Sequence, residues 1–315
     1  MTTGDGAYMR ASDAFSWYME RDPALRSTIV VAIWLDRAPQ WDVLTARIDR
    51  MTRLIPSLRQ HVVESPFRLT SPRWTYDPHF DLAWHLHRVT VPQPRTAAAV
   101  VEMARRAAMA AFDRARPLWE LTLVEGIKGG GAVLLLKLHH SLSDGVGGIQ
   151  LLTALCDLQR EPGDLGEMPP APAGETMSLP AMVAGAATSR TEQTVRTLLH
   201  GAGAAVPALL RSVRHPVTNV GGAAAMVRSV YRTAAPILDT KSPVMRDRAM
   251  TRSLATMEIP VDVLKNAART VGGTLNDVYL TAITGGLRRY HERHGATVDS
   301  LRVTVPVNIR TAGDV

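Results

Sequence analysis

The alternation of apolar and polar residues in the first half of the chain predicts strands separated by helices. Residues 27–35 (STIVVAIWL) are rich in β-branched side chains, which favour a strand. The apolar segments 118–126 and 131–140 predict two further strands, joined by the turn-forming Lys-Gly-Gly-Gly at 128–131. A shorter segment at 83–91 (AWHLHRVTV) is also typical of a strand.

Apolar residues that recur every three or four positions predict helices between these strands. In the clearest example, one helical face collects Val43, Leu44, Ile48, Met51 and Leu54. Helices are expected over residues 12–20, 38–56, 96–112 and 146–160. The first 160 residues therefore form one continuous run of regular elements, which we take as the first lobe, 1–160.

The composition changes after residue 160. Residues 161–180 are rich in Pro, Gly and acidic side chains and have almost no periodic apolar pattern, which is typical of a linker. Residues 181–235 are rich in Ala, Gly and Val. They predict weakly amphipathic helices, which either pack on a domain surface or bind lipid at an interface.

Regular elements resume near residue 251. A strand is expected at 252–260, helices at 261–271 and 274–295, and a second strand at 301–310. The chain is thus divided into a first lobe (1–160), a linker with Ala/Gly-rich helices (161–250) and the start of a second lobe (251–315).

The charge and hydropathy of the sequence limit the kinds of molecule that the protein is expected to bind. The 315-residue chain has a formal net charge of +7, but its Lys and Arg residues are dispersed and no nucleic-acid-binding motif accompanies them. We therefore expect no nucleic-acid partner; an anionic lipid surface or a phosphorylated substrate fits the charge better. The sequence shows no signal peptide and no apolar run of about 18 residues. The single cysteine, Cys156, excludes an internal disulfide and is compatible with a reducing compartment.

Two adjacent histidines end an apolar strand, in the sequence LKLHHSLSDGVGG (136–148). Successive side chains of a strand point to opposite faces, so His139 and His140 are not expected to face the same cavity. One is expected to act and the other to support it, because a neutral imidazole is the usual general base near neutral pH. Asp144 lies past the strand, and Gly145 opens a glycine-rich turn that presents free backbone N–H groups at a helix N-terminus.

The chain offers no obvious protein nucleophile for this base. It lacks the G-x-S-x-G motif, and Cys156 lies in an apolar segment where we expect a small packed core residue. Adjacent histidines on a strand are poor co-ligands, and no Cys/His spacing supports a metal site. A base without a protein nucleophile implies direct attack by a substrate hydroxyl or amine on an activated acyl group.

The segment HHSLSDG (139–145) matches the HHxxxDG signature of coenzyme-A-dependent acyltransferases and nonribosomal condensation domains. Five further segments resemble motifs of bacterial wax ester synthase/diacylglycerol acyltransferases, in the same order along the chain. They are SDAFSWYME (12–20), FDLAWHLHRV (80–89), RPLWE (116–120), LNDVYLTA (275–282) and VPVNIR (305–310).

The resemblance implies a two-lobed α/β fold like that of chloramphenicol acetyltransferase, with mixed sheets flanked by helices and a second lobe that is incomplete in this chain. It also implies acyl transfer from acyl-CoA, as co-substrate, to diacylglycerol or a fatty alcohol, giving triacylglycerol or wax ester without a bound cofactor. Two alternatives are an acyltransferase of this fold with another hydroxyl acceptor and a non-catalytic lipid-binding or scaffold homologue.

The resemblance also assigns roles to residues. His140 is implied to be the general base and Asp144 a structural residue bound to an arginine, while Glu20 and Asn276 are implied to lie near the catalytic histidine. From the sequence alone, Glu20 is equally well read as a solvated helix end, and Asn276 as a helix cap. His139 is expected to be a packed, hydrogen-bonded support residue.

Substrates of this kind are nearly insoluble in water. We therefore expect a cytoplasmic protein that binds peripherally to the inner membrane or to lipid droplets. An incomplete second lobe would leave a sheet edge and an apolar face uncovered. We expect a C-terminal fragment of the same protein, or a second copy of the chain, to cover them.

Overall fold

The computed structural model describes residues 8–64, 71–142, 145–157, 166–176, 241–246 and 249–301. The chain divides into two compact units. The first comprises residues 1–194 and 250–254, and the second comprises residues 195–249 and 255–315. Each unit is described by itself.

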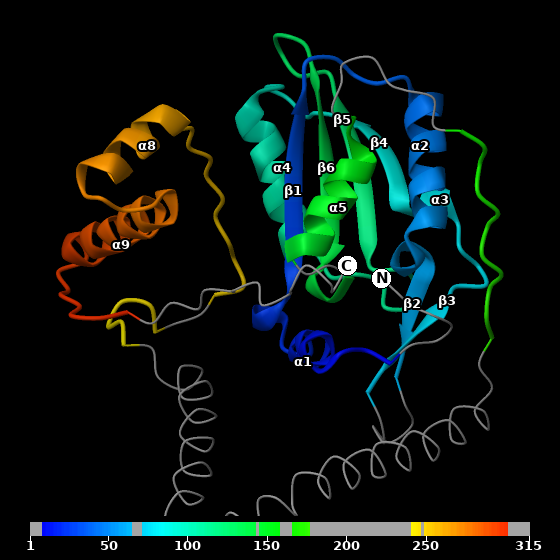
Figure 1. Ribbon diagram of the computed structural model, residues 1–315, viewed down its shortest axis with the longest axis horizontal. Coiled ribbons are helices and arrows are strands. Elements are labelled where there is room, and N and C mark those ends of the chain that lie inside the picture. Colours follow the sequence, from blue (N-terminus) through cyan, green and yellow to red (C-terminus); the bar gives the residue numbers. More distant parts are fainter. Residues whose placement is uncertain are drawn as a thin grey trace, which may run out of the picture. The chain divides into compact units, whose positions relative to one another are not determined.

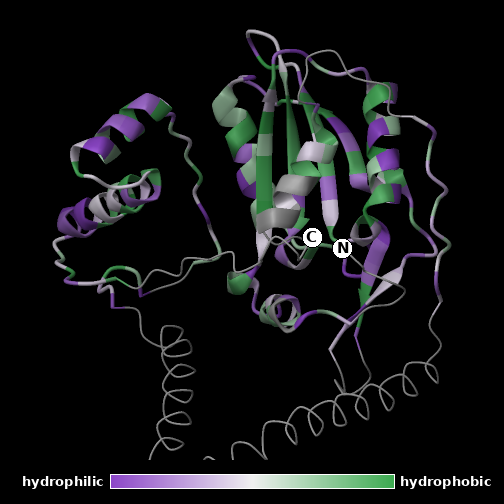
Figure 2. Ribbon diagram, viewed as in Figure 1, coloured by the Kyte–Doolittle hydropathy of each residue, from purple (hydrophilic) through white to green (hydrophobic). Residues whose placement is uncertain are grey.

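A mixed four-stranded sheet forms the centre of the first unit (Figure 1). Its strands are β1 (Thr28–Leu35), β4 (Leu86–Thr90), β5 (Trp119–Glu125) and β6 (Ala132–His139), in the spatial order β1-β6-β5-β4. Strand β6 is antiparallel to both β1 and β5, whereas β4 and β5 are parallel. All eight residues of β6 are buried, and the strand is largely hydrophobic (Figure 2).

Helices pack around this sheet, and a second, two-stranded antiparallel sheet lies beside it (Figure 1). The helices are α1 (Ala11–Met19), α2 (Trp41–Leu54), α3 (Leu82–His85), α4 (Ala97–Met109) and α5 (Gly145–Leu155). The short 3-10 helices are η1 (Pro23–Leu25), η2 (Pro56–Arg59) and η4 (His140–Leu142), and the second sheet pairs β2 (Gln60–Val63) with β3 (Arg73–Tyr76).

Alternate residues of β6 fill two separate cores. Leu134, Leu136 and Leu138 belong to the larger core, together with buried residues of α1 and α2. Val133 and Leu135 point the other way, into a smaller core with buried residues of α4. Each such side chain contributes about 1.5–3 kcal/mol by leaving water, so β6 is central to the stability of the unit.

The described part of the second unit contains helices α8 (Val261–Thr270) and α9 (Leu275–Arg293). Helix α9 begins with a capping box, because Thr274 Oγ1 accepts the N–H of Asp277 and the Asp277 carboxylate accepts the N–H of Thr274. Near its C-terminus, buried His291 donates from Nδ1 to the Leu287 carbonyl and accepts from the Ser242 hydroxyl at Nε2, 2.7 Å away.

Most expected elements are confirmed. The strands expected at 27–35, 118–126 and 131–140 are β1, β5 and β6. The helices expected before residue 160 are α1, α2, α4 and α5, and those expected after residue 260 are α8 and α9. Residues 181–235, and residues 302–310 of the last expected strand, lie outside the described residues.

Three expectations are wrong. The segment 83–91 begins as helix α3, because the Asp81 carboxylate accepts the N–H of Ala83 at 2.9 Å and starts a helical turn; strand β4 follows only from Leu86. Residues 252–260 form no strand, since no described strand pairs with them. Cys156 is exposed rather than packed in the core, because it lies just beyond the last turn of α5.

No helix in the described ranges is long and apolar enough to cross a membrane.

Candidate active site

The two adjacent histidines lie where the central strand β6 meets the 3-10 helix η4. His139 is the last residue of β6 and is fully buried, whereas His140 is the first residue of η4 and is exposed. Of the two rings, His140 is therefore the one open to solvent, and His139 is part of the packed interior.

His139 has a polar partner near each ring nitrogen. Its Nδ1 accepts the backbone N–H of Ser141 at 3.1 Å and lies 2.6 Å from the Ser141 hydroxyl. Because Nδ1 accepts, the proton of a neutral ring sits on Nε2, which lies 3.3 Å from Glu20 Oε2 without the geometry of a hydrogen bond. The rings of Trp17 and Phe112 contact His139 edge-on, with centroids at 6.0 and 6.1 Å.

Glu20 connects both sides of His140. Its Oε2 faces His139, and its Oε1 accepts the backbone N–H of Ser27 at 3.0 Å. The Ser27 carbonyl in turn accepts the N–H of His140 at 2.8 Å. One carboxylate thus lies against His139, whose Nδ1 accepts the N–H of Ser141 just after His140, and also supports the His140 amide itself through Ser27.

The surroundings of Glu20 favour the charged form of its carboxyl group. Burial raises the pKa of the Glu20 carboxyl, but the His139 ring, the Ser27 N–H and Arg114 outweigh it, so the pKa lies below its ordinary value. The side chain is only 10% exposed. The interpretation of Glu20 as a solvated helix end is therefore wrong: Glu20 caps the C-terminus of α1 with its side chain turned inward.

Asp144, Gly145 and Asn276 complete the set of expected site residues. Asp144 lies outside the described residues, and Gly145 is the first residue of α5. Asn276 is exposed on the first turn of α9 in the second unit. It is not the helix cap that we considered, because Thr274 caps α9.

Sequence reasoning missed Lys137 as a neighbour of the site. Lys137 lies on the same face of β6 as His139 and is buried, with Nζ 2.9 Å from Glu120 Oε1 and 4.2 Å from the centre of the Phe112 ring. The signal was a lysine inside an otherwise apolar strand, which a buried carboxylate or ring must compensate.

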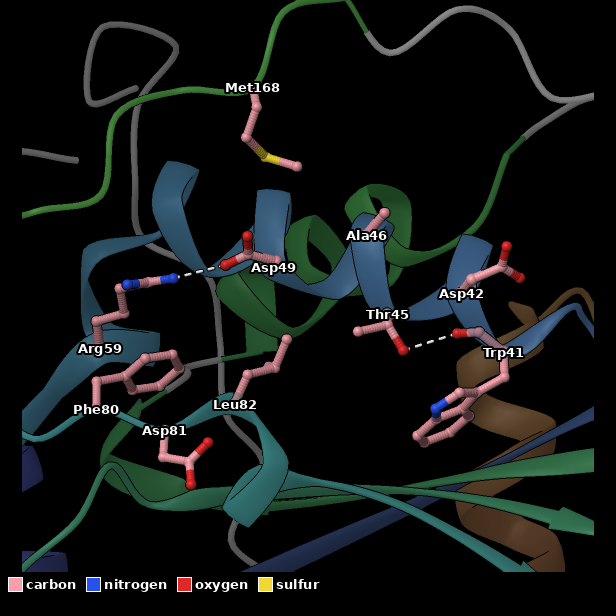
Figure 3. Close-up of a pocket in the computed structure, with 10 residues that line it drawn as sticks. All are labelled: Trp41, Asp42, Thr45, Ala46, Asp49, Arg59, Phe80, Asp81, Leu82 and Met168. Carbon is pink, nitrogen blue, oxygen red and sulfur yellow. Dashed lines mark hydrogen bonds and ion pairs between the residues drawn. The ribbon is translucent and has the colours of Figure 1, made fainter.

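A pocket of about 650 Å³ lies elsewhere in the first unit (Figure 3). It is lined by residues of α2 and of the segment 80–82, together with Arg59 and Met168. None of its lining residues belongs to β6 or η4. We therefore do not identify this pocket with the histidine site. Within the described ranges no group of three or more His, Cys, Asp or Glu side chains is placed to hold a metal ion.

The chain matches a known family over most of its length. Residues 9–279 match the family described as the wax ester synthase/diacylglycerol acyltransferase catalytic domain. A Mycobacterium tuberculosis H37Rv protein named "Putative diacyglycerol O-acyltransferase Rv2484c" is 36% identical over 299 residues, which cover 94% of this chain and 60% of that protein. Rv3087 of the same strain, which carries the same description, is 29% identical over 313 residues, or 96% of this chain and 63% of that protein.

The fold agrees with this match. The wax ester synthase/diacylglycerol acyltransferase from Marinobacter aquaeolei VT8 superposes with a TM-score of 0.56 at 19% identity, over 93% of this chain and 63% of that one. The chain thus has the mixed α/β fold of the chloramphenicol acetyltransferase type, and it spans about three fifths of the length of its curated relatives. The family match and the 36% identity together show that the chain belongs to the wax ester synthase/diacylglycerol acyltransferase family.

Proposed function

We propose that this chain carries the general base of an acyl-CoA-dependent O-acyltransferase that forms triacylglycerol from diacylglycerol, wax ester from a fatty alcohol, or both. The observation that carries the proposal is the exposed His140 ring on a backbone that is hydrogen-bonded on both sides, next to a buried His139 that lies 3.3 Å from the Glu20 carboxylate. Family membership supplies the reaction class.

In the proposed reaction, the free imidazole of His140 takes the proton of the acceptor hydroxyl. The hydroxyl oxygen attacks the thioester carbonyl carbon and forms the new C–O bond of the ester. The C–S bond then breaks, and the departing thiolate takes the proton from the His140 imidazolium. The ring ends as it began, with no acyl-enzyme and no bound cofactor. A positioned base of this kind accounts for about 10²–10⁴-fold in rate.

The chain's own contacts would place this base. The ionised Glu20 carboxylate fixes the Ser27 amide and faces the Nε2–H of His139. The Ser27 carbonyl accepts the N–H of His140, and His139 Nδ1 accepts the N–H of Ser141. The backbone is therefore held at His140 and just after it. Placement matters because a displacement of about 1 Å at a reacting group costs about 10²-fold in rate.

Thiol release from a long-chain acyl-CoA tests the proposal. We expect release that depends on added diacylglycerol or long-chain alcohol, with the matching ester detected by mass spectrometry, and loss of both in His140→Ala. Release that only a different hydroxyl compound supports would favour the same fold with another acceptor. Acyl-CoA or diacylglycerol binding without release would favour a non-catalytic lipid-binding homologue.

We also propose that the protein works at a lipid surface, peripherally at the inner membrane or on lipid droplets, since both product and acceptor partition into lipid. The net charge of +7 supports attraction to anionic headgroups. Flotation with anionic vesicles tests this: binding should weaken as salt rises and on deletion of residues 181–235. Binding indifferent to both would contradict it.

A further inference from the structure

Three arginines from separate segments of the first unit converge on Met109, the last residue of α4. Arg26, which precedes β1, donates to the Met109 carbonyl. Arg105 of α4 donates from Nη1 to Met109 Sδ at 3.5 Å and to the Arg252 carbonyl at 3.2 Å. Arg252 donates its backbone N–H to Met109 Sδ at 3.4 Å. We call Arg26, Arg105 and Arg252 the arginine cluster.

The cluster carries more positive charge than its neighbours neutralise. Arg105 pairs with Glu102 at 2.6 Å, but Glu102 also pairs with the neighbouring Arg106 at 2.9 Å. In the part of the chain that the structure describes, Arg26 and Arg252 form hydrogen bonds to carbonyl groups and no ion pair with a carboxylate. Among the described residues, Glu102 is therefore the one carboxylate paired with the cluster, and it is shared with Arg106.

Stabilisation of the C-terminus of α4 explains only part of this excess positive charge. A cation at the C-terminus of a helix is favourable by about 0.3–1 kcal/mol, and one guanidinium is enough to obtain it. Further guanidinium groups in the same part of the unit repel each other, because they carry like charges. Such an arrangement is compensated when an anion binds.

The position of the cluster relates it to the proposed base. Arg252 donates from Nη2 to the Arg26 carbonyl at 3.4 Å, and Arg26 directly precedes Ser27, whose carbonyl accepts the His140 N–H. The cluster and the His140 amide are thus attached to consecutive residues of the chain. An anion held by the cluster would therefore be bound next to the segment that positions the His140 amide.

We propose that the arginine cluster binds the phosphate groups of the acyl donor. Guanidinium groups recognise phosphate through paired N–H donors, and all three side chains are partly exposed, so donors remain available. This inference rests on the proposed function, which makes the donor a thioester of a phosphorylated carrier. It adds residues that would recognise the carrier rather than the acyl chain.

Kinetics with two donors test the proposal. Arg26→Gln and Arg252→Gln should each raise KM for acyl-CoA by about 10-fold or more, as expected when a charged hydrogen bond is lost. Neither should change kcat/KM for the acyl thioester of N-acetylcysteamine, which has no phosphate. The matched control is Arg88→Gln, which removes the same charge at an exposed site paired with Glu125 and should change neither value. An unchanged KM for acyl-CoA in both cluster variants would overturn the proposal.

Binding to the full chain separates this inference from the proposed function. Coenzyme A and inorganic pyrophosphate should protect Arg26, Arg105 and Arg252 from phenylglyoxal, read by peptide mass spectrometry on the wild-type chain, so no variant has to fold. Protection without acyltransferase activity would support the site and contradict the function. Protection by vesicles of phosphatidylglycerol but not by coenzyme A would assign the cluster to lipid headgroups and overturn the proposal.

Discussion

His139 and His140 have opposite relations to solvent, although they are adjacent in the chain. Strand alternation predicts that neighbouring side chains separate, and here β6 also ends between them, so His140 turns outward on η4. The buried ring has a protein partner near each nitrogen, which makes it a support for the exposed ring. Their substitution should therefore have different consequences.

His140→Ala should lower kcat by about 10²–10⁴-fold and leave the melting temperature nearly unchanged, because an exposed ring contributes little to packing. His139→Ala should lower the melting temperature, because it empties a buried site and leaves Glu20 and Ser141 without their partner. Thermal denaturation and thiol-release assays on both variants test this. A stable, inactive His139 variant beside a fully active His140 variant would reverse the assignment.

Glu20→Gln should remove a stabilising effect that depends on pH. The folded pKa of Glu20 lies below its ordinary value of 4.5, so its contribution is complete above that value and is lost as the pH falls through the folded pKa. The difference in melting temperature between wild type and variant should thus be largest near neutral pH and narrow below about pH 4. At neutral pH we expect kcat to fall about 10- to 100-fold with KM little changed. A pH-independent difference would contradict the role of the charge.

At the scale of elements, the sequence predicted the central strand well, but it did not predict which side chains from distant parts of the sequence contact that strand. A long apolar run, interrupted by Lys137, identified β6, because a strand covered on both faces is built mainly from apolar residues. The meeting of Glu20 with His139 was not visible, since periodicity fixes the face of a strand but not the distant side chain that packs on it. Residues 252–260 had strand-like composition but gained no partner strand.

The capping box at the start of helix α9 can be tested by substitution. Thr274→Ala removes the side chain that caps the helix and should lower the free energy of unfolding of the second unit by about 1 kcal/mol. The matched control is Thr284→Ala, whose hydroxyl donates only to the Leu280 carbonyl within the helix. Chemical denaturation followed by circular dichroism compares the two. An equal loss in both variants would mean that the capping box is not the cause.

At the scale of the molecule, the second unit exposes an apolar stripe on α9. Leu275, Tyr279, Ile283 and Tyr290 recur at helical spacing and are 45%, 59%, 41% and 45% exposed. Gly286 lies on the same face, and a Cβ atom added there would meet no atom within 4 Å, so the space above it is open. A continuous apolar stripe of this kind marks an interaction surface.

We propose that the stripe is covered by a polypeptide that corresponds to the remaining two fifths of the curated relatives. Native and denaturing mass spectrometry of the active protein should find such a polypeptide, as a separate chain or as a continuation of this one. Tyr279→Glu with Ile283→Glu should release it or abolish activity, whereas the exposed Arg289→Glu should not. A swapped homodimer would instead give two copies of this chain and nothing else. A monodisperse 34.3 kDa monomer with full activity would contradict both.

The pairing of β6 on both edges has a consequence for amide hydrogen exchange. A strand that is bonded on both sides and buried on both faces exchanges its amide protons only when the whole unit unfolds. The His140 amide, which donates to the Ser27 carbonyl just before the first residue of β1, lies at the boundary of that slow region. Its exchange rate would therefore report how often the base leaves its position while the rest of the fold stays intact.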